Sequence, residues 1–275
     1  MALPPYATPG QRLWYWLFRI FCAGVFVFLI LPILAIVPIS FSAGEWLTYP
    51  LPGLSLRWYE DFLSSEMWLN SLKNSLIVAS ATTVLATGLG TLAALGLARS
   101  HFPLKGLVMA VLISPMIVPI VITAVGVYFF FAAWGLVNTY LGLIFAHTVL
   151  AAPFVVITVT SAMQGFDRTL ARAGASLGAN PPTVFFRITL PLILPGVVSG
   201  ALFAFATSFD EVVVALFLAG PVQRTLPRQM FSGIRENISP TITAAATLLI
   251  VVSVLLMTAL ELLRRRAERL RGQLR

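Results

Sequence analysis

Cysteine, histidine and recognisable nucleotide-binding motifs are scarce or missing in this sequence. Cys22 is the only cysteine in 275 residues, which excludes an intrachain disulfide and a cysteine-ligated metal cluster. His147 has no second metal ligand at helical spacing, so we interpret it as a hydrogen-bonded packing residue and expect no metal site. There is no glycine-rich phosphate loop, so the chain itself should bind neither ATP nor another cofactor. No nucleophile and base stand out as a catalytic pair.

Charge is scarce as well. Charged residues make up 10% of the chain and hydrophobic residues 59%, whereas soluble domains carry about 25% charged residues. The composition predicts an all-α integral membrane protein with a single transmembrane domain over residues 1–275. The net charge of +8 could suggest a nucleic-acid partner. However, the basic residues lie at the ends of apolar runs, which is the pattern of a membrane protein.

Six apolar stretches approach or exceed the length of about 20 residues that a bilayer-spanning helix needs. They cover residues 20–41, 74–98, 107–131, 139–163, 191–218 and 239–260. Pro115 and Pro119 should bend the third span. Small residues in the second span suit close contacts between helices. The aromatic and acidic segment 42–73 should lie along the outer surface, and residues 219–238 form a second polar connection.

The distribution of basic residues predicts the orientation. With both termini in the cytoplasm, most of the 18 lysines and arginines fall on the cytoplasmic side, including the arginine-rich C-terminal tail. Cytoplasmic loops are enriched in these residues. This choice predicts a multi-pass membrane protein and places loop 164–190 in the cytoplasm. The basic residues left outside are Arg57, Lys73, Arg224, Arg228 and Arg235.

Loop 164–190 is a long, charged and turn-rich stretch between two apolar spans. Asp167 can cap a first helix, and Gly178 fits the left-handed position that ends it. Asn180 and Pro181 can start a second short helix, which we expect to stop at Pro191. Leu170, Ala173, Gly174 and Leu177 should share one face of the first helix. The small residues of that helix would let another protein approach its backbone.

The spacing of Gly178, Ile188, Leu190 and Pro191 resembles the cytoplasmic EAA loop of binding-protein-dependent ABC importer permeases. The family consensus begins with Glu-Ala-Ala, and this chain has Arg172-Ala173-Gly174 there. The resemblance implies an importer-type ABC permease fold with six transmembrane helices and a coupling-helix loop that docks on an ATPase. The residues it assigns to docking are Arg172, Ala173, Gly174, Leu177, Gly178 and Pro181.

Two acids interrupt the fifth apolar run. A carboxylate within a span costs roughly 2.5–3.5 kcal/mol on insertion scales and usually faces a cavity or a partner. Asp210 and Glu211 could therefore attract a cationic substrate, or they could be structural. Neighbouring residues of a helix point about 100° apart, so we expect one acid at most to face the path.

Ser208 and Phe209 precede the two acids, and together the four residues resemble the fifth span of spermidine/putrescine uptake permeases. The resemblance implies that Ser208, Phe209, Asp210 and Glu211 line the path of a small cation of the polyamine class. Further stretches resemble the same subfamily, among them RWYEDF at 57–62, SPMIVP at 114–119 and PFVVITV at 153–159. Met116 stands where some polyamine permeases have an acid, which leaves other small solutes open, such as amino-acid-like, opine-like or other organic ions.

Three classes of function are compatible with the sequence. An importer permease would be non-catalytic and would work with a second permease, two ATPase copies that bind ATP and Mg²⁺, and an extracytoplasmic substrate-binding protein, as the resemblance implies. A secondary transporter would favour broken helices or repeats and a proton-coupling residue. An intramembrane enzyme would need a polar pair deep in the bundle, for which His147 is the candidate.

Overall fold

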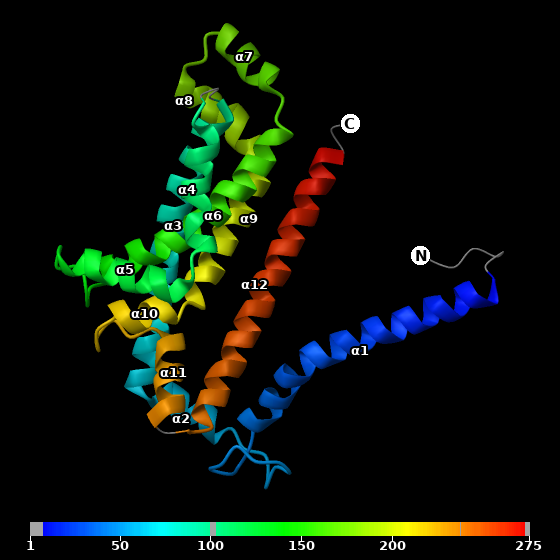
Figure 1. Ribbon diagram of the computed structural model, residues 1–275, viewed down its shortest axis with the longest axis vertical. Helices are drawn as coiled ribbons and strands as arrows, with labels where there is room; N and C mark the ends of the chain where they lie inside the picture. Colours follow the sequence, from blue (N-terminus) through cyan, green and yellow to red (C-terminus); the bar gives the residue numbers. More distant parts are fainter. Residues whose placement is uncertain (1–7, 100–102, 237, 273–275) are drawn as a thin grey trace. The chain divides into compact units, whose positions relative to one another are not determined.

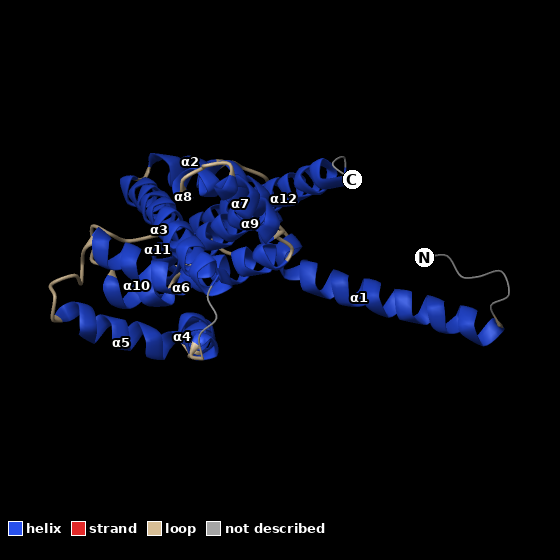
Figure 2. Ribbon diagram, turned by 90° about the horizontal axis from the view of Figure 1, so that it is seen from above, coloured by secondary structure: helices blue, strands red, loops and turns tan. Residues whose placement is uncertain are grey.

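The computed structural model describes residues 8–99, 103–236 and 238–272, and these residues are almost entirely helical. They divide into two compact units. The smaller unit comprises the described residues of 1–64 and 237–249, and the larger unit those of 65–236 and 250–275. Within the described ranges, the extended structure consists of one isolated bridge between Ser42 and Leu54. The predicted all-α class is confirmed (Figures 1 and 2).

The smaller unit contains α1 (Pro9–Ser40), α2 (Arg57–Ser64) and the start of α12 (Thr241–Gly272). Hydroxyl and indole groups connect the end of α1 to α2. The Ser40 hydroxyl lies 2.7 Å from that of Tyr59, and the Trp58 Nε1 donates to the Ser42 carbonyl at 2.8 Å. Asp61 accepts a 2.6 Å hydrogen bond from Thr241, the first residue of α12. The polar segment 42–73 is therefore folded and includes a helix, and its last residues already belong to the next long helix.

Three long helices form the centre of the larger unit. They are α3 (Glu66–Arg99), α6 (Tyr140–Gln164) and α9 (Leu190–Phe209), and they pack directly against one another. The small residues of the second span are buried in part, since Ala79, Ala86 and Ala94 are completely buried whereas Ser80 and Gly88 are exposed. Gly90 lies so close to Val155 that a β-carbon would approach its side chain to 2.7 Å. Small residues therefore allow the three helix backbones to lie close together.

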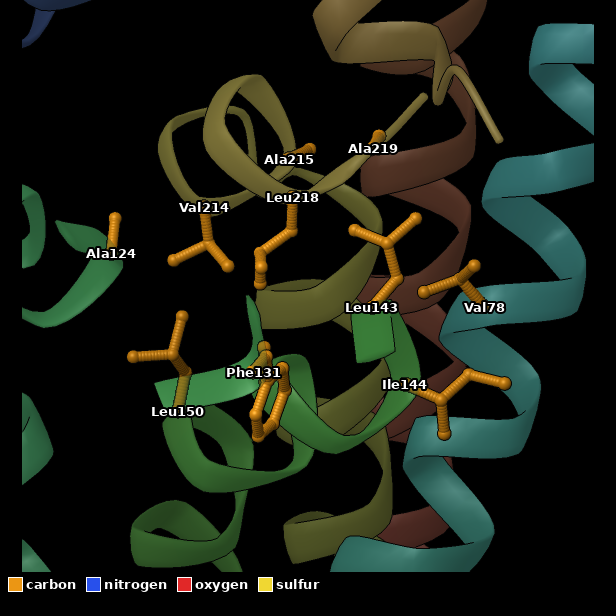
Figure 3. Close-up of a cluster of buried hydrophobic side chains, with 11 residues drawn as sticks. Val78, Ala124, Phe131, Leu143, Ile144, Leu150, Val214, Ala215, Leu218 and Ala219 are labelled. Atoms are coloured by element: carbon orange, nitrogen blue, oxygen red, sulfur yellow. The ribbon is translucent and has the colours of Figure 1, made fainter. Parts of the chain in front are cut away.

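The predicted third span is two helices, α4 (Lys105–Ile117) and α5 (Ile120–Ala132), which meet at 105°. The sequence predicted a bend from its prolines but not one this sharp. Pro119 has no N–H to continue the ladder, and it pushes Val118 to an extended conformation, φ −67° and ψ 133°. α5 then packs against α10 (Val213–Leu218), which adds to a cluster of buried apolar side chains from α3, α5, α6 and α10 (Figure 3).

The helices around Pro191 differ from the prediction. The second loop helix does not stop there, because α8 (Pro181–Val184), a π-helical turn η1 (Phe185–Thr189) and α9 form one continuous helix. In this wider turn the Leu190 N–H donates to the Phe185 carbonyl, five residues back. An α-helical turn would bring the Pro191 ring against the carbonyl four residues earlier. The π turn makes room for the ring, so the helix passes through the proline.

The predicted fifth span, 191–218, is interrupted as well. α9 ends at Phe209, and α10 starts at Val213. Residues 219–238, predicted as a polar connection, contain α11 (Leu226–Glu236). Five helices of the described chain are long and apolar enough to cross a membrane, and α4 with α5 supply a sixth if the bent pair counts as one span. The loop helix α7 (Arg168–Ser176) completes the set.

The two neighbouring glycines of α3 give a matched test of the close packing. Gly90→Ala should lower the stability of the protein by about 1–3 kcal/mol, because the new methyl group meets Val155 and the Ala152 carbonyl. Gly88 is exposed, and an added β-carbon there would have no neighbour within 4 Å. Gly88→Ala should leave stability unchanged or raise it by up to about 1 kcal/mol, because alanine favours helix. Thermal unfolding in detergent measures both, and equal melting temperatures would contradict the packing.

Candidate functional site

Two breaks in the helices open a cavity inside the larger unit. The break between α4 and α5 and the break between α9 and α10 face each other across a cavity of about 720 Å³. Leu150 and Phe154 of α6 line it as well. Most of the lining is apolar, and the lining residues that carry a charge are Asp210 and Glu211. The full lining is Pro115, Met116, Ile117, Val118, Pro119, Ile120, Leu150, Phe154, Ala206, Thr207, Asp210, Glu211, Val212 and Val213.

The two acids have different environments. Asp210 is the C-cap residue that follows α9. Its backbone N–H donates to the Ala206 carbonyl, and its side chain is exposed. Within the described chain its carboxylate has neither a hydrogen-bond partner nor an ion-pair partner. Glu211 is buried, with 6% of its surface exposed. One acid therefore offers its charge to the cavity, and the other is enclosed by protein.

Glu211 holds the start of α10. Its Oε1 accepts from the Val214 N–H at 2.7 Å and its Oε2 from the Ala215 N–H at 3.0 Å. These amides have no partner within the helix, so a carboxylate there accepts their hydrogen bonds. The negative charge of the carboxylate is also stabilised by the positive end of the helix dipole. The same interaction competes with a continuous helix through residues 210–212. The prediction that both acids lie on one uninterrupted helix is therefore wrong, and the two acids differ in burial, Asp210 being exposed and Glu211 buried.

His147 lies between Ser208 and Glu211. Its Nδ1 lies 2.8 Å from the Ser208 hydroxyl, whereas its buried Nε2 lies 3.5 Å from Glu211 Oε2 and has no hydrogen-bond partner in the described structure. The interpretation of His147 as a hydrogen-bonded packing residue is confirmed. Serine, histidine and an acid in contact resemble a hydrolase triad. However, Ser208 is 4% exposed and does not line the cavity, and backbone amides hold both Glu211 oxygens. A substrate could not reach this serine.

The structure brings only part of the predicted path to the cavity. Ser208 and Phe209 are buried away from it, and Phe209 stacks on Phe205 with ring centroids 5.4 Å apart. The aromatic ring at the cavity is that of Phe154, which stacks on Phe203 at 6.1 Å. Sequence reasoning missed Phe154 as a lining residue. Pro153 beside it and the proline pair of the α4–α5 break were the available signals, because helix irregularity in a membrane protein lines cavities.

The loop helix α7 begins and ends as the sequence predicted. Asp167 accepts a hydrogen bond from the Thr169 N–H at 2.9 Å, and these contacts with Thr169 lower the pKa of the Asp167 carboxyl. Gly178 has φ +87°; its N–H donates to Ala175, and the Ala179 N–H donates to Gly174. This pair of bonds is a Schellman motif. Asn180 then caps α8 through the Thr183 N–H, with Pro181 in the first turn. The loop is a preformed unit.

The predicted common face of α7 divides in two. Gly174 faces inward, where a β-carbon would meet Ile188 at 2.4 Å. Leu170, Ala173 and Leu177 remain exposed, and 88% of Leu177 is accessible. Arg172 and Pro181 are exposed as well. The Arg168 guanidinium donates to the Ala98 carbonyl near the end of α3 and so fastens the loop to the bundle. The α7–α8 loop thus presents an apolar and basic surface to its surroundings.

Isosteric neutralisation separates the roles of the two acids. Glu211→Gln should destabilise the protein by about 1.5–3 kcal/mol, because it weakens two charge-assisted hydrogen bonds to α10. Asp210→Asn should stay within about 0.5 kcal/mol of the parent, because this carboxylate has no partner in the described chain. Melting temperatures of the purified protein measure both, and an Asp210→Asn variant as unstable as Glu211→Gln would refute the assignment.

Comparisons with known proteins agree with this architecture. Residues 86–269 match the family described as "Binding-protein-dependent transport system inner membrane component". The chain is 31% identical to the spermidine/putrescine transport system permease protein PotC of Escherichia coli K12 over 89% of this chain and 92% of that protein. It is 34% identical to the putrescine transport system permease protein PotI of the same organism, over 82% of each.

A solved structure shares the fold. It is a bacterial ABC transporter involved in the import of the acidic polysaccharide alginate; its TM-score to this chain is 0.76 at 13% identity, and the match covers 94% of this chain and 99% of that one. At this identity the match shows the fold alone. The family match covers most of the chain, and the two permeases are similar over more than four fifths of it. The chain therefore belongs to the binding-protein-dependent transport system inner membrane components and is a permease subunit of an ABC importer.

Proposed function

We propose that this permease forms part of the translocation path for a small polyamine-like cation such as putrescine or spermidine. The observation that carries the proposal is the Asp210 carboxylate, exposed at a cavity of about 720 Å³ and without a partner in the described chain. An ammonium group would supply that partner. Phe154 and the apolar lining would contact the alkyl stem, and the aromatic face also attracts cations. The similarity to PotC and PotI supports the same class of substrate.

A second candidate is another small organic cation with a single charge. Met116 lines the same cavity as the acids, and Glu211 is occupied with α10. This chain would then supply one exposed carboxylate for one ammonium group. A polyamine would need its further charges matched by the second permease. Uptake measurements with both kinds of solute distinguish the two candidates.

The orientation and partners follow the charge distribution and the loop. Both termini and the α7–α8 loop would lie in the cytoplasm, where Lys and Arg are enriched. There the exposed face with Leu170, Ala173 and Leu177 would dock on an ATPase that binds ATP and Mg²⁺. A second permease would complete the path, and an extracytoplasmic binding protein would deliver the solute. ATP binding would move the loop and, through the continuous α8–α9 helix, the Asp210 break.

Asp210→Asn should reduce solute uptake. A charge attraction over about 4 Å at an effective dielectric of about 20 amounts to at most roughly 4 kcal/mol. With water and screening we expect a loss of about tenfold, which corresponds to about 1.4 kcal/mol. The measurement is uptake of labelled putrescine and spermidine by cells with the complete importer. Glu66→Gln is the control, because it removes an exposed carboxylate that does not line the cavity.

Parental uptake of every transported solute by a correctly assembled Asp210→Asn importer would refute the path assignment. Uptake of a monoamine, but not of putrescine or spermidine, by the parental importer would favour the second candidate.

Gly178→Leu should disrupt the docking of the loop on the ATPase and so lower transport. Its φ of +87° disfavours a side chain by roughly 1–2 kcal/mol, and the corner should deform. Gly165→Leu is the matched control, because Gly165 has a φ of −89° and no atom closer than 3.9 Å to a β-carbon position. We expect lower uptake and lower binding-protein-stimulated ATPase activity for Gly178→Leu alone, at similar membrane levels. If both activities stay at the parental level, the loop has no role in coupling.

A further inference from the structure

A second cavity, of about 530 Å³, lies between the first half of α3 and the connection from α10 to α11. Within the larger unit, Figure 1 shows α10 and α11 toward the end away from α7 and α8. The lining is polar and basic, in contrast to the cavity at Asp210. It consists of Met67, Asn70, Ser71, Lys73, Asn74, Tyr140, Pro221, Val222 and Arg224.

No acid is found among the lining residues of this second cavity. Lys73 is exposed and forms no ion pair with a described residue. Arg224 donates from Nη1 to Gln229 at 2.9 Å, while its buried Nε has no hydrogen-bond partner in the described structure. Burial lowers the pKa of the Arg228 guanidinium, and the nearby positive charge of Arg224 lowers it further. The positive charge gathered here is therefore not neutralised by the described residues of the unit.

The cavity is held in shape by its own hydrogen bonds. Asn74 Nδ2 donates to the carbonyls of Val222 and Arg224, at 2.8 and 3.0 Å, and its Oδ1 accepts from the Tyr140 hydroxyl at 2.7 Å. The Leu226 N–H donates to the Ser75 hydroxyl at 2.8 Å. The loop after α10 is thus fastened to α3, and Lys73 and Arg224 are presented together without further rearrangement. Such preorganisation lowers the cost of binding.

We propose that this cavity receives a carboxylate side chain of the binding protein when that protein docks on the importer. Arginine and lysine with flanking amide and hydroxyl donors suit a carboxylate, which forms strong charge-assisted hydrogen bonds. A cationic solute would be repelled from it, so the cavity lies off the path. The choice of partner rests on the proposed orientation, which puts this end of the unit outside. The family is binding-protein-dependent, which supplies a docking partner on that side.

The test is the affinity of the importer for the binding protein of the same system. The complete importer, with second permease and ATPase in nanodiscs, is titrated with solute-free binding protein at two salt concentrations. Lys73→Glu should raise Kd about tenfold or more, and Lys73→Gln and Arg224→Gln should raise it less and weaken its salt dependence. Arg235→Gln is the matched control, because Arg235 is a basic residue of α11 that does not line the cavity. It should bind within about twofold of the parent.

Affinity within about twofold of the parent for both Lys73 variants, with unchanged salt dependence, would overturn the proposal. An adequately folded Arg224→Gln is not required for this conclusion, because Lys73 is exposed. The measurement contains no solute, so a wrong polyamine assignment leaves its outcome intact. A single cysteine at position 73, with Cys22 replaced by serine, should react with a membrane-impermeant thiol reagent added to spheroplasts. If that reaction does not occur, the proposed orientation is wrong, and the proposed docking site is wrong with it.

Discussion

The capping of α10 by the buried Glu211 carboxylate is the interaction on which the cavity depends. By accepting hydrogen bonds from two free amides, Glu211 stabilises a helix start at Val213. α9 therefore ends at Phe209 and leaves the chain free to turn at Asp210. His147 and Ser208 complete the buried polar group around Glu211. The position of the exposed Asp210 carboxylate therefore follows from the burial of Glu211.

α10 connects two cavities of opposite charge. Glu211 binds its first amides, and at its far end the Arg228 guanidinium donates to the carbonyls of Ala219 and Gly220. The helix dipole stabilises a negative charge at the start of a helix and a positive charge at its end. The six-residue helix is thereby fixed between the Asp210 cavity and the basic cavity at Lys73.

Local features were predictable from the sequence where a single residue type determines the geometry. Asp167 and Asn180 have the predicted cap roles because few side chains can accept a hydrogen bond from the free amides of a helix start. Gly178 has its predicted role because few residue types other than glycine adopt a positive φ. The breaks were harder to predict. Pro119 signalled a bend, but its angle depends on the packing of α5 on α10. The π turn before Pro191 and the burial of Ser208 and Glu211 depend on contacts between distant helices, and apolar composition carries no signal for them.

The accessibility of thiols at neighbouring positions near the end of α9 tests the arrangement of the α9–α10 break most directly. In a Cys22→Ser background, single cysteines replace Thr207, Ser208 or Asp210, and a small cationic thiol reagent reports their exposure to water. Cysteines at positions 207 and 210 should react quickly, because both residues line the cavity. A cysteine at position 208 should react slowly, because that side chain is buried against His147. Rapid reaction at 208 with protection at 210 would contradict the account, because it would turn the helix end the other way.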